Sequence, residues 1–447
     1  MFRVIDLILL IFCMKININS EVPAGEPLLK MPEQKISPSA VRHKEVRQKL
    51  ETEIKKGVGA SIVNLVNHVI ELAHNVKASD IHIDPQGNAV RIRMRIDGVL
   101  QDETPLPKNI QSEVISRIKI LAGLRTDEHQ VAQDGRFRIQ LNSGNVDIRV
   151  SIVPTYYGEN AVMRLLKDQN EQYALDSLGF SPGDRAKILK AIKYPYGMIL
   201  ATGPTGSGKT TTLYTLIKLL NTPGASIITI EDPIEYSIEG INQIGVNSRT
   251  GLNFANGLRA VLRQDPNIIM VGEIRDEETA GLAVNTALTG HLVLSTIHTN
   301  DAATTLPRLI DLKIEPYLIA STVNIAIGQR LVRRICETCK KEIKITDEQA
   351  ESLKEVVSED ILGSETIFYK GEGCDACNNT GYKGRVCINE VLVVDNAIRS
   401  AIHRKATAAE IKEETKKQQM TSMIEDGFLK AKLGITTIEE ILRTLHE

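Results

Sequence analysis

The chain of 447 residues contains no tryptophan, and aromatic residues make up only 4% of it. Proteins that hold single-stranded nucleic acid commonly stack the bases on aromatic side chains, so this scarcity argues against that class. The net charge is only −2, from 54 basic and 56 acidic residues, which argues against a general nucleic-acid coat. Six cysteines are too few for a disulfide framework in a chain of this length.

The chain also has little that resembles a membrane segment. The apolar stretch Leu7–Met14 is much shorter than the roughly 20 apolar residues that a bilayer requires. We interpret it as a helix that packs on a partner, or as sequence upstream of a true start at Met14. A signal peptide is the alternative, but no small-residue cleavage site follows the stretch. With 42% hydrophobic and 25% charged residues, the rest predicts a soluble globular chain of several domains.

The first part of the chain predicts a linker followed by a small domain. Residues 1–57 are rich in proline and charge from position 21 onward, and predict an N-terminal segment and linker with a short helix near Val41–Lys56. Residues 58–165 predict an α+β domain, because helical spacing of apolar residues alternates with short strands. The expected strands are Asp80–Ile83, Ala89–Ile96, Arg136–Leu141 and Val146–Val153. Residues 166–196 predict a second linker.

The second part predicts a larger α/β domain over residues 197–335. Short, wholly apolar strands alternate there with helical segments, which is typical of a buried and mostly parallel sheet. The expected strands are Met198–Thr202, Ile227–Glu231, Ile268–Gly272 and Leu292–Thr296. A cysteine-bearing insertion is expected at 336–387, with a helix near Asp347–Val357, and a helical region at 388–447.

A phosphate-binding loop connects the strand Met198–Thr202 to a segment that is helical by pattern. It is a complete G-x-x-x-x-G-K-[ST] match, formed by Gly203, Pro204, Thr205, Gly206, Ser207, Gly208, Lys209 and Thr210. Glycines let backbone N–H groups turn toward phosphate oxygens, and the following helix directs its positive end there. We expect Lys209 to reach the β- and γ-phosphates of ATP and the Thr210 hydroxyl to ligate Mg²⁺.

Polar residues follow the apolar strands at the edge where such a sheet binds its ligand. Glu273 comes just after the strand Ile268–Gly272 and is our candidate for polarising the attacking water. A usual Walker B motif has an aspartate where this strand has Gly272. Glu231 ends another strand, and His298 follows a third, with His291 just before it. A solvated charge run around Glu273 and structural histidines are the alternatives.

Four cysteines form two C-x-x-C pairs, which are Cys336 with Cys339 and Cys374 with Cys377. Four thiolates can enclose one Zn²⁺ ion tetrahedrally and leave no open position, so this predicts a structural rather than a catalytic zinc site. Two disulfides are the alternative, and they would be unusual beside a nucleotide motor in the reducing cytosol. Cys13 and Cys387 are interpreted as ordinary free thiols.

These motifs, in this order, resemble the secretion ATPase superfamily, in particular the type II secretion and type IV pilus assembly ATPases of the GspE/PilB type. The resemblance covers about residues 60–447. Besides the phosphate loop, it is carried by ITIEDPIEY at 228–236, LRQDPNIIMVGEIRD at 262–276, TGHLVLSTIHTNDA at 289–302, SDIHIDP at 79–85 and RIRMRIDG at 91–98. The implied fold is α/β: a RecA-like P-loop ATPase domain, a preceding small α+β (PAS-like) domain and a tetracysteine zinc insertion.

The resemblance also implies roles for individual residues. Glu273 corresponds to the catalytic glutamate, Glu231 to the acid of the Asp box and His298 to the histidine of the His box. Arg136 and Arg149 lie where the preceding domain supplies arginines to the nucleotide of the neighbouring subunit. The implied protein is a homo-hexamer in the cytoplasm, peripheral at the inner membrane, which binds ATP, Mg²⁺ and Zn²⁺ and acts with the membrane platform and cytoplasmic components of its machine.

Two alternatives stay open at this point. One is a pilus-retraction or DNA-translocating P-loop motor, although the metal-binding insertion is generally lacking in retraction ATPases and the composition predicts no nucleic-acid partner. The other is a scaffold that binds nucleotide without hydrolysing it. About 57 residues precede the conserved part, fewer than the larger docking domain of many relatives, so docking through such a domain is in doubt.

Overall fold

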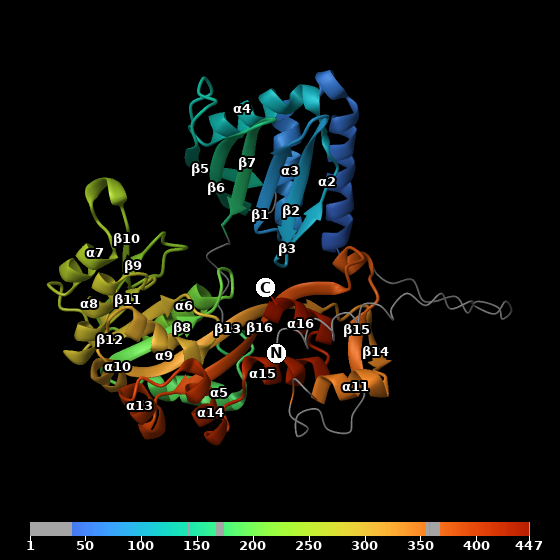
Figure 1. Cartoon of the computed structure of the whole chain (residues 1–447). Coiled ribbons are helices and arrows are strands. Elements are labelled where there is room, and N and C mark those ends of the chain that lie inside the picture. The colour runs from blue at the N-terminus through green and yellow to red at the C-terminus, as the bar shows by residue number, and fades with distance from the viewer. Residues whose placement is uncertain (1–37, 142–143, 167–173, 355–356, 358–366, 447) are drawn as a thin grey trace. The chain divides into compact units, whose positions relative to one another are not determined.

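The computed structural model describes residues 38–141, 144–166, 174–354, 357 and 367–446 (Figure 1). The expectations about Leu7–Met14, the start at Met14 and Cys13 lie outside these ranges. The chain divides into two compact units, one formed mainly by residues 22–171 and one mainly by Gln172–Gly373 and Thr380–Glu447. Among the described residues, no helix combines the length and the apolar character needed to cross a bilayer.

The N-terminal unit is an antiparallel sheet with helices on one face. The strand order is β3-β2-β1-β7-β6-β5, with β4 paired to β2. Its elements are α2 (Pro38–Lys55), α3 (Ile62–Asn75), β1 (Asp80–Pro85), β2 (Ala89–Ile96), β3 (Val99–Asp102), β4 (Leu106–Pro107), α4 (Gln111–Leu121), β5 (Gln133–Leu141), β6 (Gly144–Thr155) and β7 (Gly158–Leu165).

Strict alternation of side chains explains why this sheet has one apolar and one charged face. Strand β2 buries Val90, Ile92 and Met94 in the core with α3 and α4, and its arginines 91, 93 and 95 alternate with them. The same period continues in β6, which buries Val146, Ile148, Val150 and Ile152. The charged face therefore follows directly from the sequence pattern.

The second unit contains a seven-stranded sheet in the order β10-β9-β11-β12-β8-β13-β16. All neighbouring strands run parallel except β13 and β16, which are antiparallel. The elements up to the end of β13 are α5 (Pro182–Ala191), β8 (Gly197–Thr202), α6 (Lys209–Leu220), β9 (Ile227–Glu231), β10 (Asn242–Gly245), α7 (Phe254–Val261), β11 (Ile268–Val271), α8 (Glu277–Leu288), β12 (Leu292–Ile297), α9 (Ala302–Asp311), α10 (Pro316–Thr322) and β13 (Val323–Ile335).

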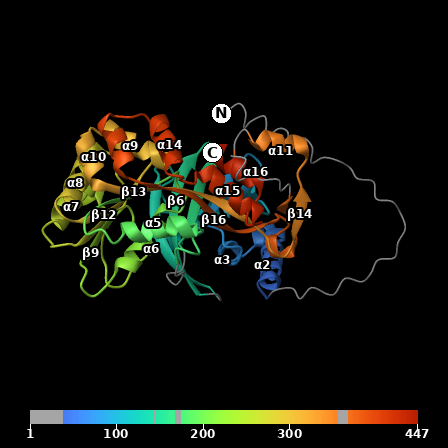
Figure 2. The same cartoon turned by 90° about the horizontal axis from the view of Figure 1, so that it is seen from below.

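Helices cover both faces of this sheet, which is why its central strands are buried along their whole length. In β8, Met198 and Leu200 belong to one apolar core, while Ile199 and Ala201 belong to the other. Figure 2 shows α9 and α10 on one side of the strands and α5 and α6 on the other. The predicted α/β class is thus confirmed.

The last part of the chain differs from the expected helical region. Strand β16 (Tyr382–Val393) returns to the main sheet and pairs with β13, so the expected insertion at 336–387 ends inside a strand. A short apolar run fits a buried strand as well as a helix, so periodicity alone could not place it. The remaining elements are β14 (Lys340–Lys344), α11 (Asp347–Lys354), β15 (Ile367–Gly371), α13 (Asn396–His403), α14 (Ala408–Lys417), α15 (Met423–Lys432) and α16 (Ile438–His446).

Candidate nucleotide and metal sites

The phosphate loop joins β8 to α6 as the sequence predicts. Gly203, Gly206 and Gly208 all have positive φ angles, which residues with a side chain rarely adopt. A Cβ atom on Gly203 would also lie 2.2 Å from the backbone oxygen of Gln329, so only glycine fits there. The loop thus leads into the N-terminus of α6, where backbone N–H groups favour an anion.

Lys209 is folded back onto this loop. Its Nζ atom donates hydrogen bonds to the carbonyl oxygens of Gly203 and Pro204, at 2.8 and 2.9 Å. Burial lowers the pKa of Lys209 to about 8, and the nearby charge of Glu273 opposes that shift. The buried Ser207 hydroxyl has no hydrogen-bond partner within the described part of the chain. A cation held by loop carbonyls and an unsatisfied buried hydroxyl both fit a site built for phosphate.

Glu273 lies two residues beyond the end of β11 and is almost buried, with 11% of its side chain exposed. Its Oε2 atom lies 3.1 Å from Nε2 of His298, which follows β12. Its Oε1 atom lies 2.6 Å from Nη2 of Arg275. Strands β8, β11 and β12 are parallel, so their carboxyl ends bring the phosphate loop, Glu273 and His298 to one edge of the sheet.

The end of β12 is tied to the start of the phosphate loop. Thr202, the last residue of β8, accepts a hydrogen bond from the backbone N–H of Thr299 at 3.1 Å. The Thr202 hydroxyl also donates a hydrogen bond to the carbonyl oxygen of Thr299 at 3.0 Å. His291 lies before the other end of β12 and contacts the carbonyl of Thr286 at 3.0 Å, so the structure places it away from this edge.

Glu231 is 3% exposed, and both of its carboxylate oxygens accept hydrogen bonds. Oε1 accepts from Thr229 at 2.5 Å and from Gln243 at 3.1 Å, while Oε2 accepts from the hydroxyl of Tyr214. Burial and the adjacent Glu231 carboxylate raise the pKa of Tyr214, which keeps its hydroxyl protonated as a donor. Because Tyr214 lies on α6, Glu231 connects the helix of the phosphate loop to β9 and β10.

Arg136 and Arg149 belong to the N-terminal unit, where they lie directly opposite each other on β5 and β6. Arg149 is in turn opposite Arg164 on β7, and Arg164 forms an ion pair with Asp80 on β1 at 2.9 Å. The arginines therefore form a row across the charged face of this sheet. Their predicted role toward a neighbouring nucleotide stays a prediction.

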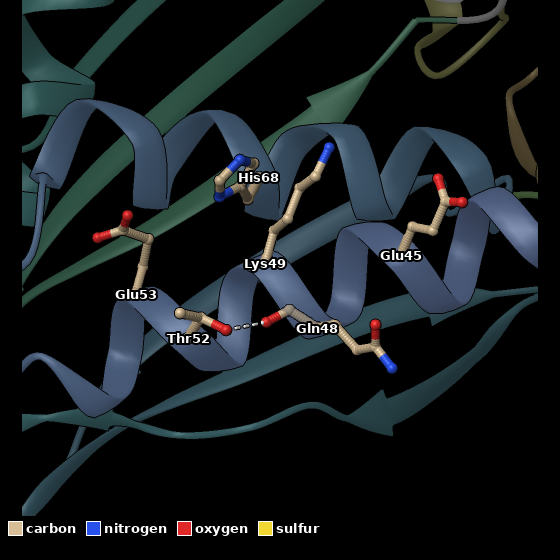
Figure 3. Close-up of a pocket in the computed structure, with 6 residues that line it drawn as sticks. All are labelled: Glu45, Gln48, Lys49, Thr52, Glu53 and His68. Atoms are coloured by element: carbon tan, nitrogen blue, oxygen red, sulfur yellow. Dashed lines mark hydrogen bonds between the residues drawn. The ribbon is translucent and has the colours of Figure 1, made fainter.

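The N-terminal unit also has an open crevice of about 320 Å³ between α2 and α3 (Figure 3). Burial lowers the pKa of His68, which lines the crevice beside Glu53. On α2, beside Glu53, the Thr52 hydroxyl donates to the carbonyl oxygen of Gln48 at 2.7 Å. The crevice contains none of the predicted site residues.

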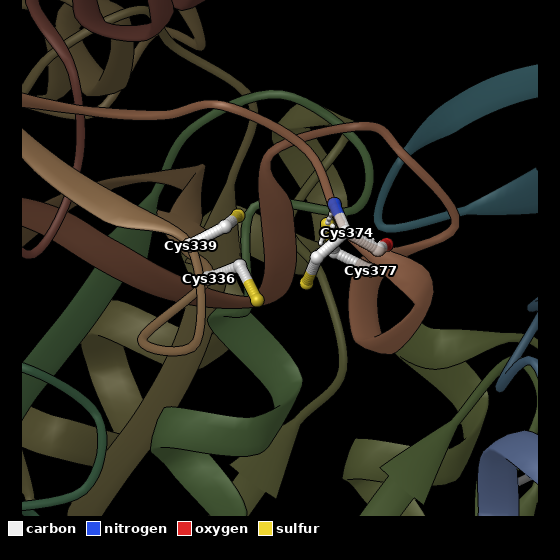
Figure 4. A group of neighbouring side chains, drawn as sticks. All are labelled: Cys336, Cys339, Cys374 and Cys377. Atoms are coloured by element: carbon white, nitrogen blue, oxygen red, sulfur yellow. Dashed lines mark hydrogen bonds between the residues drawn. The ribbon is translucent and has the colours of Figure 1, made fainter. Parts of the chain in front are cut away.

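The four paired cysteines come together at one point, with Cys336 and Cys339 facing Cys374 and Cys377 (Figure 4). All four sulfur atoms lie within 4.8 Å of one another, and those of Cys374 and Cys377 are 3.7 Å apart. Sulfurs about 2.3 Å from a tetrahedral zinc ion would be roughly 3.8 Å apart, so the cluster fits such an ion. In the described part of the chain none of these cysteines forms a disulfide, in contrast to the disulfide alternative.

Sequence reasoning missed the partners that surround the predicted residues. Arg275 was visible only as part of a charge run, and its contact with Glu273 depends on the conformation of the segment between β11 and α8. No sequence pattern pointed to Tyr214 or Gln243 as partners of Glu231, because they lie 17 residues before it and 12 residues after it. The motif positions gave the candidate site residues, and the fold supplied their neighbours.

Known proteins resemble this chain over most of its length. The type IV pilus assembly ATPase PilB of Thermus thermophilus is 50% identical over 382 residues, which cover 85% of this chain and 43% of that protein. The type II secretion system protein E of Xanthomonas campestris is 45% identical over 391 residues, which cover 87% of this chain and 68% of that protein. The chain thus spans less than half the length of the first relative and about two thirds of the second.

Solved structures show the same fold. A crystal structure of the pilus retraction motor PilT with bound ADP matches with a TM-score of 0.57 and 27% identity, and covers 84% of this chain and 95% of that one. The ATPase DotB of Legionella pneumophila has a TM-score of 0.61 at 23% identity, with 84% and 93% covered. A family model described as type II/IV secretion system protein matches residues 56–443. The chain belongs to this family of type II/IV secretion system proteins.

Proposed function

We propose that this chain is the subunit of an ATP-hydrolysing motor that drives pilin or pseudopilin assembly in a type IV pilus or a type II secretion machine. The relatives named PilB and type II secretion system protein E support this proposal, at 43–50% identity. The single observation that carries it is that the carboxyl ends of the parallel strands β8, β11 and β12 bring the phosphate loop, Glu273 and His298 to one edge of the sheet.

Residues 203–210 hold the nucleotide in this proposal. The positive-φ glycines and the N-terminus of α6 surround the phosphates, and Lys209 exchanges its loop carbonyls for phosphate oxygens. Thr210 is the residue that would ligate Mg²⁺, and a bound Mg²⁺ ion supplies charge that offsets the phosphates. The unsatisfied hydroxyl of Ser207 supports this assignment, since a buried donor needs a partner.

Glu273 accepts a hydrogen bond from the attacking water and orients it, while His298 holds the other carboxylate oxygen in place. Glu231 serves the site indirectly in this proposal. Its oxygens are occupied by Thr229, Tyr214 and Gln243, so it holds α6 and thereby the phosphate loop in position.

The working form is a homo-hexamer in which Arg136 and Arg149 approach the nucleotide of the neighbouring subunit. Such arginines neutralise charge in the transition state only when the two groups meet, which makes hydrolysis depend on domain movement. We place the motor in the cytoplasm, peripheral at the inner membrane through the platform proteins of its machine, and without a nucleic-acid partner. The four clustered cysteines hold a structural Zn²⁺ ion.

The test compares phosphate release by the full chain with that of Glu273→Gln. Losing a positioned base typically costs about 10²–10⁴-fold in turnover, while the shape of the amide leaves ATP binding intact. The matched control is Glu277→Gln, an exposed acid on α8 that pairs with Lys313. A Glu273→Gln rate within a factor of about three of the parent would contradict the assignment of the base.

Cell experiments distinguish the alternatives. In the source organism, Glu273→Gln should abolish pilus extension or secretion while the protein level stays unchanged. Absence of turnover in the parent, even with the membrane platform present, would support a nucleotide-gated scaffold instead. Hydrolysis that DNA stimulates in a salt-sensitive manner would support a DNA-translocating motor. Extended pili that no longer shorten would support a retraction motor.

A further inference from the structure

Both oxygens of the Glu273 carboxylate are engaged by cationic side chains or by side chains that can become cationic. Arg275 reaches Oε1 at 2.6 Å, and His298 reaches Oε2 at 3.1 Å. Only 11% of the glutamate side chain is exposed, whereas 65% of the arginine side chain is. Arg275 thus faces the solvent and covers the nearly buried carboxylate of Glu273.

Charged groups at neighbouring strand ends interact with Glu273 or with Arg275. Lys209 follows the phosphate loop, His298 follows β12, and Asp232 follows β9. The hydrogen bond to Glu273 raises the pKa of Arg275, and the charge of Asp232 adds to the effect. The Arg275 guanidinium therefore offsets the negative charges of both Glu273 and Asp232. The hydrogen bonds of Lys209 go instead to loop carbonyls.

This arrangement addresses a problem that the proposed reaction poses. A carboxylate that orients water near the terminal phosphate of ATP repels that phosphate, and the repulsion is strong where water is largely excluded. A nearby fixed cation reduces the repulsion without removing the carboxylate. Arg275 is held by the same acid whose charge has to be offset.

We propose that Arg275 is a positioning residue for the hydrolytic site: it holds Glu273 in place and offsets its charge, so that the site accepts a nucleoside triphosphate beside a carboxylate base. This inference rests on the proposed function. The pair differs from an ordinary surface ion pair such as Arg259 with Glu278, in which both side chains are about half exposed, at 46% and 56%. Exposed pairs of that kind contribute little.

The test is a double-mutant cycle on binding, which requires no hydrolysis. The affinities of the full chain for a non-hydrolysable ATP analogue and for ADP, each with Mg²⁺, are measured for the parent, Arg275→Met, Glu273→Gln and the double variant. Arg275→Met should weaken the ATP analogue about tenfold and ADP less, because the γ-phosphate lies nearest to the uncompensated carboxylate. In the Glu273→Gln background, Arg275→Met should lower the affinity for the ATP analogue less than about twofold.

Two further variants sharpen the result. Arg275→Lys retains the positive charge and should restore most of the affinity for the ATP analogue, and Arg259→Met is the matched control that should leave it unchanged. In turnover, Arg275→Met should raise KM for ATP several-fold more than it lowers kcat, because the main effect is on triphosphate binding.

Each outcome decides the inference. An equal loss of affinity with and without Glu273 would show that Arg275 contacts the phosphate itself or only supports the fold, and would overturn the proposal. Unchanged affinity in Arg275→Met would overturn it as well. If the parent binds the analogue but never hydrolyses ATP, the proposed function fails while the binding cycle still decides the role of Arg275.

Discussion

Glu390 of β16 lies directly opposite Gly328 of β13, and its side chain uses the space that a larger residue would fill. Its Oε1 atom accepts a hydrogen bond from the N–H of Ala302 at 2.6 Å, and its Oε2 atom accepts one from Met423 at 3.2 Å. These residues begin α9 and α15, where negative charge is favoured. One buried carboxylate therefore joins the helix that follows the His box to the C-terminal part of the chain.

Replacing Gly328 by alanine should destabilise the second unit. The new Cβ atom would lie 2.9 Å from Cγ and Oε1 of Glu390 and 3.1 Å from the backbone nitrogen of Ala302. Overpacking of this kind typically costs about 1–3 kcal/mol, which thermal unfolding of the full chain would detect. Gly281→Ala, inside α8 with open space around it, is the control and should be neutral or slightly stabilising. Equal stability of the two variants would contradict the close fit.

The cysteine cluster should hold about one Zn²⁺ ion per chain, because four thiolates satisfy one tetrahedral ion. The double variant Cys374→Ser/Cys377→Ser should lose the metal, as measured by elemental analysis, and should still bind nucleotide. Cys387→Ala is the control and should keep its zinc, since Cys387 lies outside the cluster. Retention of stoichiometric zinc in the double variant would rule out this site.

Lowering the pH should decrease the stability of the N-terminal unit, because Asp80 becomes protonated. Burial alone would raise the pKa of this carboxyl, but hydrogen bonds from Arg164 and Ser79 and the charge of Arg95 outweigh it and lower the pKa overall. A lowered pKa in the folded state means that its stabilising contribution is present above the unfolded pKa of about 3.9 and is lost as the pH falls further.

Hydrogen exchange of the full chain between about pH 3 and 6 would measure this effect in β1 and β7, where we expect weaker protection at the acidic end. Asp80→Asn should reduce that dependence on pH. Asp102→Asn is the control, because Asp102 is 60% exposed and pairs with Arg91 on the surface. An unchanged acid dependence in Asp80→Asn would show that other groups cause it.

Catalysis should be shared between subunits if Arg149 acts in the way that the family resemblance implies. Arg149→Ala and Glu273→Gln should each be nearly inactive alone, whereas rings that contain both variants should regain partial phosphate release. Some interfaces then pair an intact arginine with an intact glutamate from the next subunit. A mixture that stays inactive, although mixed rings demonstrably form, would reassign Arg149 to its own subunit or to a structural role.

Local pattern was enough to predict much of this protein. The phosphate loop is contiguous, and its glycines, lysine and flanking strand and helix are all encoded within about a dozen residues. Strands β2 and β9 have the bounds that alternation and apolar runs predicted, Ala89–Ile96 and Ile227–Glu231. Each C-x-x-C pair likewise needs only a tight turn, so the four candidate zinc ligands were visible before their convergence was known.

Long-range packing decided the rest. Strand β16 returns to the main sheet from a segment that follows the cysteine cluster, and a short apolar run does not reveal its pairing partner. Glu390 reaches Ala302 across 88 positions, and Glu231 meets Tyr214 across 17. The sequence determined which groups are the candidates for the chemistry, because their motifs are local. Tertiary structure alone decided which side chains hold them, because those contacts form only when distant segments pack together and exclude water.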